Sequence, residues 1–222
     1  MAAFNGKEFT NDVLCGTSSG DTMRGYTGND KIFGYGGPDE IEGGTGNDTL
    51  DGGRGEDTIY NDDGDDLIAG GLGRDILVLN AHRAPIRVDL METGPQDTGQ
   101  GLDTIRSIEY VYIYERDGTN GAWLRGGAGS EVLPGAWGND TLTGGGGADA
   151  FQFRNGQDVV TDFGVTFDQL VYLGSVETCK QAVANAEVVD GNLVLSFSAS
   201  DSVTLVGVDH LGRIDQWLSL EG

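Results

Sequence analysis

The chain has 222 residues, of which 39 are glycine and only four are proline, and its formal charge is −23 at pH 7. This negative charge argues against nucleic acid and anionic membrane surfaces as direct partners. Because glycine is so abundant, the chain is expected to bury a long narrow core and not a thick globular one.

Residues 16–78 repeat with a period of nine. Each row has an aspartate at its sixth position and an apolar residue two places later. The aspartates are Asp21, Asp30, Asp39, Asp48, Asp57, Asp66 and Asp75, and the apolar residues are Met23, Ile32, Ile41, Leu50, Ile59, Ile68 and Leu77. Glycine fills the first and fourth positions in six of the seven rows, which gives the pattern G-G-x-G-x-D-x-U-x. A fixed period of this length predicts a solenoid.

Each part of the row has its own physical reason. Glycine adopts positive φ angles that other residues avoid, so a tight loop can expose its carbonyl oxygens on one side. The aspartate adds a charged oxygen, and such an oxygen set suits Ca²⁺ better than Mg²⁺, which keeps its waters and requires a stricter octahedron. The last three residues of each row form a minimal strand with one inward apolar side chain.

These rows resemble the RTX, or haemolysin-type, calcium-binding repeats. The resemblance implies an all-β chain whose fold is a right-handed parallel β-roll, a β-solenoid in which two rows form one coil. Loops 18 residues apart would then stack on the same edge. The first edge would carry Asp21, Asp39, Asp57 and Asp75, and the second edge Asp30, Asp48 and Asp66.

The resemblance also implies one Ca²⁺ ion between each pair of stacked loops. The lower loop would give the carbonyls of positions two and four and its aspartate, and the upper loop the carbonyls of positions one and three and its aspartate. Five sites follow for this block: Thr17, Ser19, Asp21 with Gly34, Gly36, Asp39; Tyr26, Gly28, Asp30 with Gly43, Thr45, Asp48; Tyr35, Gly37, Asp39 with Gly52, Arg54, Asp57; Gly44, Gly46, Asp48 with Asn61, Asp63, Asp66; and Gly53, Gly55, Asp57 with Gly70, Leu72, Asp75.

A second block of rows follows an interruption. Its acids are Glu131, Asp140, Asp149 and Asp158, again nine residues apart. The resemblance implies two more sites here: Gly127, Gly129, Glu131 with Gly144, Gly146, Asp149; and Ala136, Gly138, Asp140 with Phe153, Asn155, Asp158. The preceding row has Ala122 in place of the acid, so that coil is expected to pack without a full ion site.

Two rows of the first block depart from the pattern. The first has Thr17 and Ser19 in place of glycine, and the sixth opens with Asn61 and Asp62. Both are expected to bind calcium less tightly. The alternative is a metal-free solenoid in which the aspartates only form turns, but turn formation alone does not require an acid in every row.

The remaining segments are predicted to be rich in strands. Apolar residues alternate in residues 80–116, which indicates a hairpin or irregular coil beside the roll, with Tyr110, Tyr112 and Tyr114 as a packing stripe. Residues 163–222 are expected to form strands, with a helix at 176–186, and to cap the solenoid. The predicted domains are therefore residues 1–79, 80–116, 117–162 and 163–222.

The resemblance implies export through a type I secretion channel, read from a C-terminal signal for which residues 214–220 are candidates. Residues 1–10 lack the features of a cleavable signal peptide, and no apolar run could span a membrane. We therefore expect an extracellular or cell-surface protein. Cys15 and Cys179 are expected to be free, buried thiols.

Catalysis is not expected. The chain has two histidines, His82 and His210, and no H-E-x-x-H motif, and we expect no lipase nucleophile elbow. Two other functions stay open. One is binding of an extracellular, alginate-like polysaccharide; its candidate aromatic and cationic residues are Tyr26, Phe33, Tyr35, Tyr60, Arg24, Arg54 and Arg74. The other is a hydrolase with its site within residues 80–116.

Overall fold

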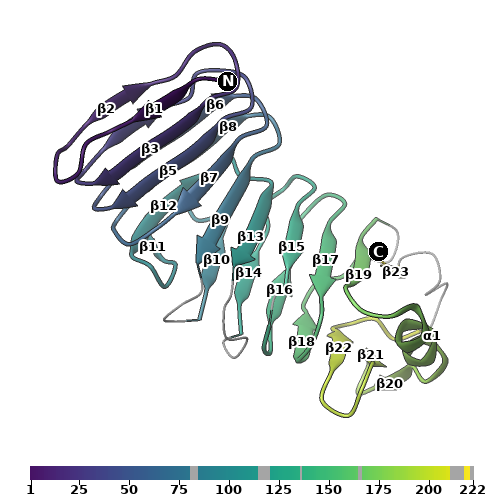
Figure 1. Ribbon diagram of the computed structural model, residues 1–222. Helices are drawn as coiled ribbons and strands as arrows, with labels where there is room; N and C mark the ends of the chain where they lie inside the picture. The colour runs from purple at the N-terminus through teal and green to yellow at the C-terminus, as the bar shows by residue number, and fades with distance from the viewer. Residues whose placement is uncertain (81–84, 115–120, 136, 165–166, 211–217, 221–222) are drawn as a thin grey trace. The chain divides into compact units, whose positions relative to one another are not determined.

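The computed structural model describes residues 1–80, 85–114, 121–135, 137–164, 167–210 and 218–220. It divides into two units, Met1–Tyr114 and Glu115–Gly222, which are described separately below. Both consist mainly of short parallel strands, and the described residues contain a single helix, in the second unit (Figure 1). The prediction of an all-β parallel solenoid is therefore confirmed.

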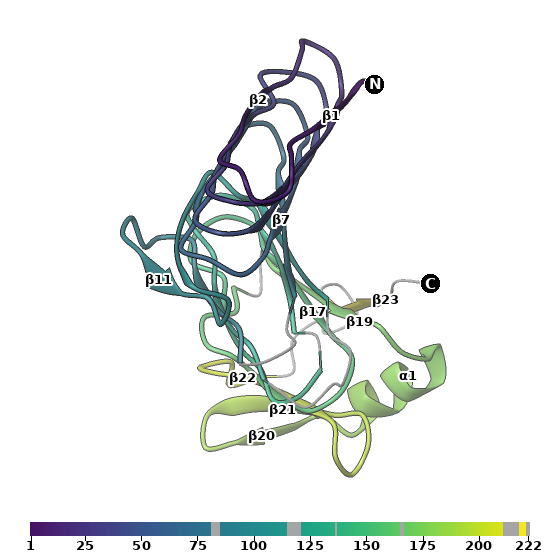
Figure 2. The ribbon, with the colours of Figure 1, turned by 60° about the vertical axis from the view of Figure 1, so that its left-hand side comes forward.

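The first unit has two sheets, and successive strands alternate between them. One sheet contains β1 (Ala3–Asn5), β3 (Thr22–Thr27), β5 (Glu40–Thr45), β7 (Thr58–Asn61), β9 (Ile76–Asn80) and β13 (Tyr110–Tyr114). The other contains β2 (Val13–Cys15), β4 (Lys31–Phe33), β6 (Thr49–Arg54), β8 (Leu67–Leu72), β12 (Leu102–Arg106) and β11 (Gln96–Asp97). Figure 2 shows β1 and β2 on opposite sides of the first coil.

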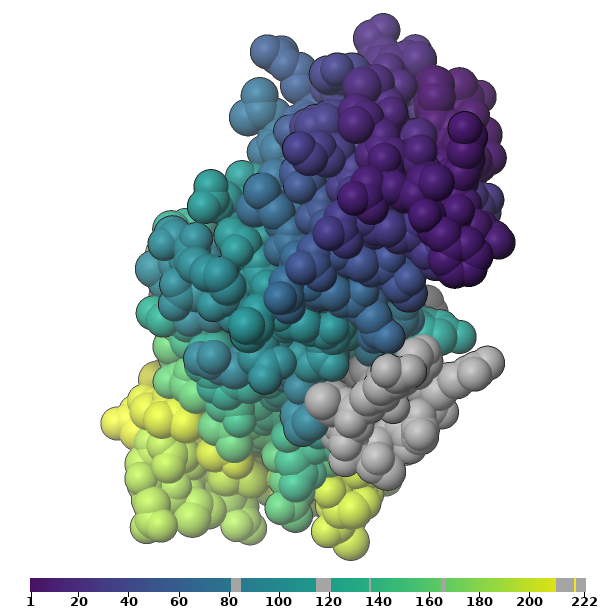
Figure 3. All heavy atoms as spheres, turned by 90° about the vertical axis from the view of Figure 1, so that its left-hand side faces the viewer, coloured from purple at the N-terminus to yellow at the C-terminus, as the bar shows by residue number. Residues whose placement is uncertain are grey.

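Each of the first five rows pairs with the row 18 residues further along. Met23 lies beside Ile41 and Ile41 beside Ile59 in one sheet, and Ile32 lies beside Leu50 in the other. The apolar side chain of each row points inward, and all seven are at most 1% exposed. Successive coils of this unit, purple to blue, lie directly against one another in Figure 3. The core is thus a single stack of inward side chains, as the nine-residue period predicts.

The interruption between the two repeat blocks is partly solenoid. β12 pairs in parallel with β8, and β13 pairs in parallel with β9, so both continue the coils. Only β11, which forms an antiparallel pair with β12, leaves this pattern as a hairpin, while β10 spans Arg87–Asp89. The tyrosines of β13 face outward, since Tyr112 is 45% exposed whereas Val111 is fully buried. They are not core residues, as the exposure shows.

The second unit continues the same architecture. One sheet contains β15 (Val132–Pro134), β17 (Ala150–Phe153), β19 (Gln169–Tyr172) and β23 (Leu218–Leu220). The other contains β14 (Trp123–Arg125), β16 (Thr141–Thr143), β18 (Gln157–Val160), β22 (Ser202–Leu205), β21 (Asn192–Ser196) and β20 (Glu187–Val189). Strands β20 and β21 are antiparallel and form the last strands of this sheet.

The tail contains the predicted helix, α1, at Val176–Ala184. Ser175 caps its start, because the Ser175 hydroxyl accepts a hydrogen bond from the amide of Thr178. Cys179 lies on its buried face and is free, as expected. Cys15 is also free, but the expectation that it is buried is wrong, because it ends strand β2 on the outward face.

Some of the sequence expectations fall partly or wholly outside the described residues. These are His82, Ala136 and residues 214–217 of the proposed secretion signal. Within the described residues, no helix is long and apolar enough to cross a bilayer. The four-part domain division stays a prediction.

Candidate calcium sites

The predicted acidic residues form ladders along the edges of each unit. In every predicted pair, the amide of the earlier acid donates a hydrogen bond to one carboxylate oxygen of the acid 18 residues later. For Asp21 to Asp39 the distance is 2.7 Å, and for Asp48 to Asp66 it is 2.8 Å. The other five pairs are Asp30–Asp48, Asp39–Asp57, Asp57–Asp75, Glu131–Asp149 and Asp140–Asp158. The backbone register therefore brings together all seven predicted pairs.

The second oxygen of these carboxylates is buried without a hydrogen-bond partner among the described residues. This holds for Oδ2 of Asp30, Asp39, Asp48, Asp57 and Asp75. The side chains are at most 3% exposed, so bulk solvent hardly reaches these oxygens. An unpaired carboxylate oxygen is costly to bury, and a cation at this point would satisfy it.

Main-chain carbonyls converge on the same place. A Cβ built on Gly25 would lie within 3.0 Å of both Oδ2 of Asp30 and the carbonyl oxygen of Gly43. The same holds one row on, at the other edge, for Gly34 with Asp39 and Gly52. A carboxylate oxygen and a main-chain carbonyl oxygen therefore lie near each other beside the first glycine, and oxygens of these two kinds are the ligands of a hard cation.

Glycine is required at the first position of a row for a reason other than positive φ, the expected one. Its φ is not positive, whereas the second and fourth positions of most rows do have positive φ, as at Gly44 (φ 94) and Gly46 (φ 124). At the first position a side chain would instead collide with the aspartate Oδ2 of its own loop. At the second position the requirement for positive φ holds even for a bulky residue, as Tyr26 (φ 77) shows.

The electrostatics of the clefts also favour a cation. Burial raises the pKa of Asp39, Asp48 and Asp75 to about 6 each, and that of Asp66 to about 7, while amide hydrogen bonds oppose the rise. Repulsion between stacked acids adds to it: Asp57 raises the pKa of Asp39, and Asp103 that of Asp66. The folded chain thus holds carboxylates that resist ionisation in the absence of positive charge.

A sequence profile of the RTX calcium-binding nonapeptide repeat matches the chain in four copies, at residues 16–50, 42–77, 117–151 and 125–160. The chain carries RTX repeats. The matched segments contain all the acids of both predicted ladders, so the repeats found by the profile are the ones whose acids are stacked in the structure.

Among solved structures, the crystal structure of the extracellular lipase LipA from Serratia marcescens is similar at 23% sequence identity, with a TM-score of 0.32. The similarity covers 88% of this chain and 40% of the lipase chain, so this chain spans less than half of that enzyme. No curated protein sequence matches the chain.

The carbonyls of the RTX loops are already partly engaged. The third-position carbonyls of Thr45, Asp63 and Leu72 accept hydrogen bonds from fourth-position amides of the loop below. A carbonyl oxygen has two lone pairs, so it can accept such a bond and still contact a cation. Among the described residues, no three acidic, histidine or cysteine side chains converge, so each cleft offers two carboxylates and otherwise main-chain oxygens.

The first and sixth rows, which depart from the repeat pattern, differ from the others in the hydrogen bonds to their carboxylates. Oδ2 of Asp21 accepts hydrogen bonds from the amide and hydroxyl of Thr17, so it has donors of its own. A bond from the amide of Ala2 is the main reason that the pKa of Asp21 is lowered. In the sixth row, Nδ2 of Asn61 donates to Oδ2 of Asp103 at 3.0 Å. Protein donors thus occupy carboxylate oxygens at these two rows, whereas the aspartates of the other five rows of the first block each keep one oxygen without a donor among the described residues.

Four acids of the ladders were not predicted. Asp12 precedes the first block, and its amide donates to Asp30; Asp103 and Glu109 accept from the amides of Asp66 and Asp75, and Asp168 from that of Asp149. Asp12 continues the nine-residue period backwards and could have been found. The others follow insertions of irregular length, so the spacing alone does not reveal them.

A ladder of asparagine side chains also runs along the second edge of the first unit. Oδ1 of Asn11 accepts from the amide of Asn29, Oδ1 of Asn29 from that of Asn47, and Oδ1 of Asn47 from that of Asp65. These residues occupy the fifth position of each row on the second edge. The rows of the first edge have Gly20, Pro38, Glu56 and Arg74 at this position. Only the second edge has this side-chain ladder among the described residues of the unit.

The sequence does contain the letters of the nucleophile-elbow motif, although no elbow is expected. Gly16-Thr17-Ser18-Ser19-Gly20 does have the letters G-x-S-x-G. An elbow requires a strand followed by a helix, whereas these residues join β2 to the strand β3. Ser18 therefore lies in an RTX loop and not on an elbow.

Proposed function

We propose that the chain is a secreted calcium-responsive module, in which Ca²⁺ between stacked RTX loops drives folding and rigidity. The observation that carries the proposal is the row of buried aspartate oxygens without donors. Removing one carboxylate from water costs several kcal/mol when no partner compensates it. Each loop pair repeats that cost, so the folded chain without cations is expected to be unstable.

The ligands would be the seven residue sets of the sequence analysis, each with two carboxylates and four carbonyls. Calcium supplies positive charge that the side chains of the clefts lack. The protein's own contribution is to hold the oxygens in register through the amide-to-carboxylate ladder. The ladders also suggest Asp12, Asp103, Glu109 and Asp168 as further candidate ligands at the ends of the stacks.

Export through a type I channel follows from the same proposal. A chain that stays unfolded where calcium is scarce would pass through a narrow channel and fold outside, where calcium is plentiful. We propose no enzymatic activity for these residues, because the repeat itself accounts for the acids of the ladders.

Circular dichroism during a calcium titration, with magnesium as the control, tests the proposal. We expect a weak β signal in chelator and a cooperative gain with calcium but not with magnesium. A chain that is already fully β-structured in chelator would contradict coupled folding and binding.

A second candidate, binding of an extracellular polysaccharide, is favoured by one observation. A pocket of about 440 Å³ on the first unit contains Arg24 and Tyr26, two of the residues named for this function. Tyr60, on β7 of the same sheet, lies beside Glu42, the ion-pair partner of Arg24, but does not line the pocket. The remaining candidates lie elsewhere. Phe33 and Arg54 belong to strands of the opposite sheet, and neither Tyr35 nor Arg74 lines the pocket.

A further inference from the structure

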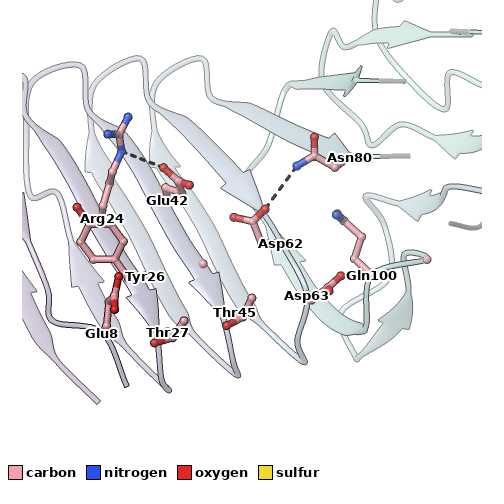
Figure 4. Close-up of a pocket in the computed structure, with 12 residues that line it drawn as sticks. Glu8, Arg24, Tyr26, Thr27, Glu42, Thr45, Asp62, Asp63, Asn80 and Gln100 are labelled. Carbon is pink, nitrogen blue, oxygen red and sulfur yellow. Dashed lines mark hydrogen bonds and ion pairs between the residues drawn. The ribbon is translucent and has the colours of Figure 1, made fainter. Parts of the chain in front are cut away.

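The pocket lies on the outer face of the first unit, at the ends of four adjacent strands. Arg24, Tyr26 and Thr27 come from β3, and Glu42 and Thr45 from β5. Asp62 follows β7, Asn80 ends β9, and Gln100 comes from the turn before β12; Figure 4 shows these side chains on the same side of the sheet. A volume of about 440 Å³ is within the usual range for small-ligand sites, roughly 300–1,000 Å³.

The lining is suited to hydroxyl groups. Carboxylates, side-chain amides and threonine hydroxyls surround one aromatic ring, that of Tyr26, which is 43% exposed. Carboxylates accept hydrogen bonds from hydroxyls, amides and hydroxyls both donate and accept, and the ring offers an apolar face. A pyranose ring presents the complementary surface, with hydroxyls around its rim and C–H groups on its faces.

The charge of the lining decides between classes of sugar. The acids are Glu8, Glu42, Asp62 and Asp63, and the single base, Arg24, is paired with Glu42 at 2.9 Å. Asp62 is repelled by Glu42 and receives a hydrogen bond of 3.4 Å from Asn80. A uronate carboxylate would enter a region of formal charge −3, which opposes its binding. Neutral and amino sugars do not meet this repulsion.

The pocket also depends on the calcium clefts. Tyr26, Thr45 and Asp63 line the pocket with their side chains, and their carbonyls belong to the proposed ion sites of the second edge. Ions between these loops would fix the spacing of the pocket side chains. By thermodynamic linkage, a ligand in the pocket would then tighten calcium binding in return.

We propose that this pocket binds a short oligosaccharide without negative charge, and that binding requires calcium. The inference rests on the proposed calcium module and replaces an alginate-like ligand with a neutral or amino-sugar one.

The test begins with the full chain on an array of immobilised neutral, glucosamine-based and uronate oligosaccharides, with calcium or with chelator. The expected result is calcium-dependent binding to neutral or glucosamine oligosaccharides and none to uronates. Binding to uronates alone, binding to no oligosaccharide, or equal binding in chelator would each overturn the proposal.

A matched pair of variants then locates the site. Tyr26→Asn removes the ring and keeps a residue that tolerates the positive φ, and Tyr35→Asn does the same at φ 69 outside the pocket. By isothermal titration with the oligosaccharide found on the array, we expect about tenfold weaker binding for Tyr26→Asn and less than about twofold change for Tyr35→Asn. Equal losses in the two variants would contradict the assignment.

Calcium titrations by circular dichroism keep the two proposals apart. If calcium folds the chain but no oligosaccharide binds, the pocket proposal alone is wrong. If the chain is folded in chelator and still binds an oligosaccharide through Tyr26, the calcium requirement is wrong. The assignment of the binding site to this pocket would then be retained.

Discussion

The amide nitrogen of Asp48 lies 2.8 Å from Oδ1 of Asp66, one coil further along the chain, while Oδ2 of Asp48 has no hydrogen-bond partner among the described residues. Asp48 also accepts a bond from the amide of Asp30. One residue therefore links three successive loops of the second edge and presents a free oxygen to the cleft. Its replacement is expected to disturb two ion sites at once.

Asp48→Ala should raise the calcium midpoint of folding more than Asp21→Ala. Asp48 belongs to two proposed sites, whereas Asp21 belongs to one and already has Thr17 as a donor. We expect about tenfold or more for Asp48→Ala, since even partners that only support metal ligands change affinity on that scale. Calcium titration by circular dichroism measures both midpoints. Equal midpoints would count against the stacked-loop assignment.

Gly43→Ala should be costly, and Gly36→Ala should not. A Cβ at Gly43 would meet Oδ2 of Asp48 within 3.0 Å, whereas at Gly36 the nearest atom is 3.6 Å away and φ is not positive. We expect Gly43→Ala to lower the free energy of unfolding in calcium by about 1–3 kcal/mol, and Gly36→Ala to change it by less than about 0.5 kcal/mol. Urea unfolding at saturating calcium provides the comparison, and similar values for both variants would refute the proposed role of the first glycine.

The calcium-free chain should gain structure on mild acidification. The raised pKa values, about 6 for Asp39 and Asp48 and about 7 for Asp66, mean that the folded state binds protons more tightly than the unfolded state. Protonation therefore stabilises the fold at low pH, and this contribution is lost as pH rises through about 6–7. Circular dichroism of calcium-stripped protein should show more β signal at about pH 5 than at about pH 8.

The same protons compete with calcium. The calcium midpoint should thus rise as pH falls below about 7, because the ion must displace protons from the clefts. A midpoint that is independent of pH, or a β signal that declines on acidification of the stripped protein, would show that the carboxylates ionise freely in the folded chain.

Asn61→Gly should destabilise the first unit although it restores the repeat consensus. Asn61 is fully buried, and its Nδ2 donates to Asp103 and to Gln100. Loss of these donors is expected to cost about 1–3 kcal/mol of unfolding free energy. Asn47→Gly is the matched control, because it removes an exposed ladder bond at a similar backbone cost. A smaller effect at Asn61 than at Asn47 would be the contrary result.

The sequence predicts the parallel stack well because one row determines three things at once. The acid, the apolar residue and the glycines recur in fixed register, so the pairing of Met23 with Ile41 and of Asp21 with Asp39 follows from the period. A slip by one residue would turn the apolar side chains outward, which disfavours that register.

What the sequence does not predict begins where the period is broken. Asp103 continues the ladder 37 residues after Asp66, and Glu109 continues the other ladder 34 residues after Asp75. The hairpin of β11 and the loop before it take up the difference, and their lengths are set by packing rather than by the repeat. The steric need for glycine at the first position is also not evident from the sequence, because φ preferences do not reveal a collision with the aspartate Oδ2.

The asparagine ladder of the second edge makes the two sides of the first unit unequal. Its bonds need no metal, so Asn11, Asn29 and Asn47 would keep their loops joined after chelation, while the opposite edge, with Pro38 and Glu56 at the same position, has no such link. Loss of ions should then separate the loops of the first edge before those of the second edge. Hydrogen exchange of the backbone amides would accordingly begin at the first edge.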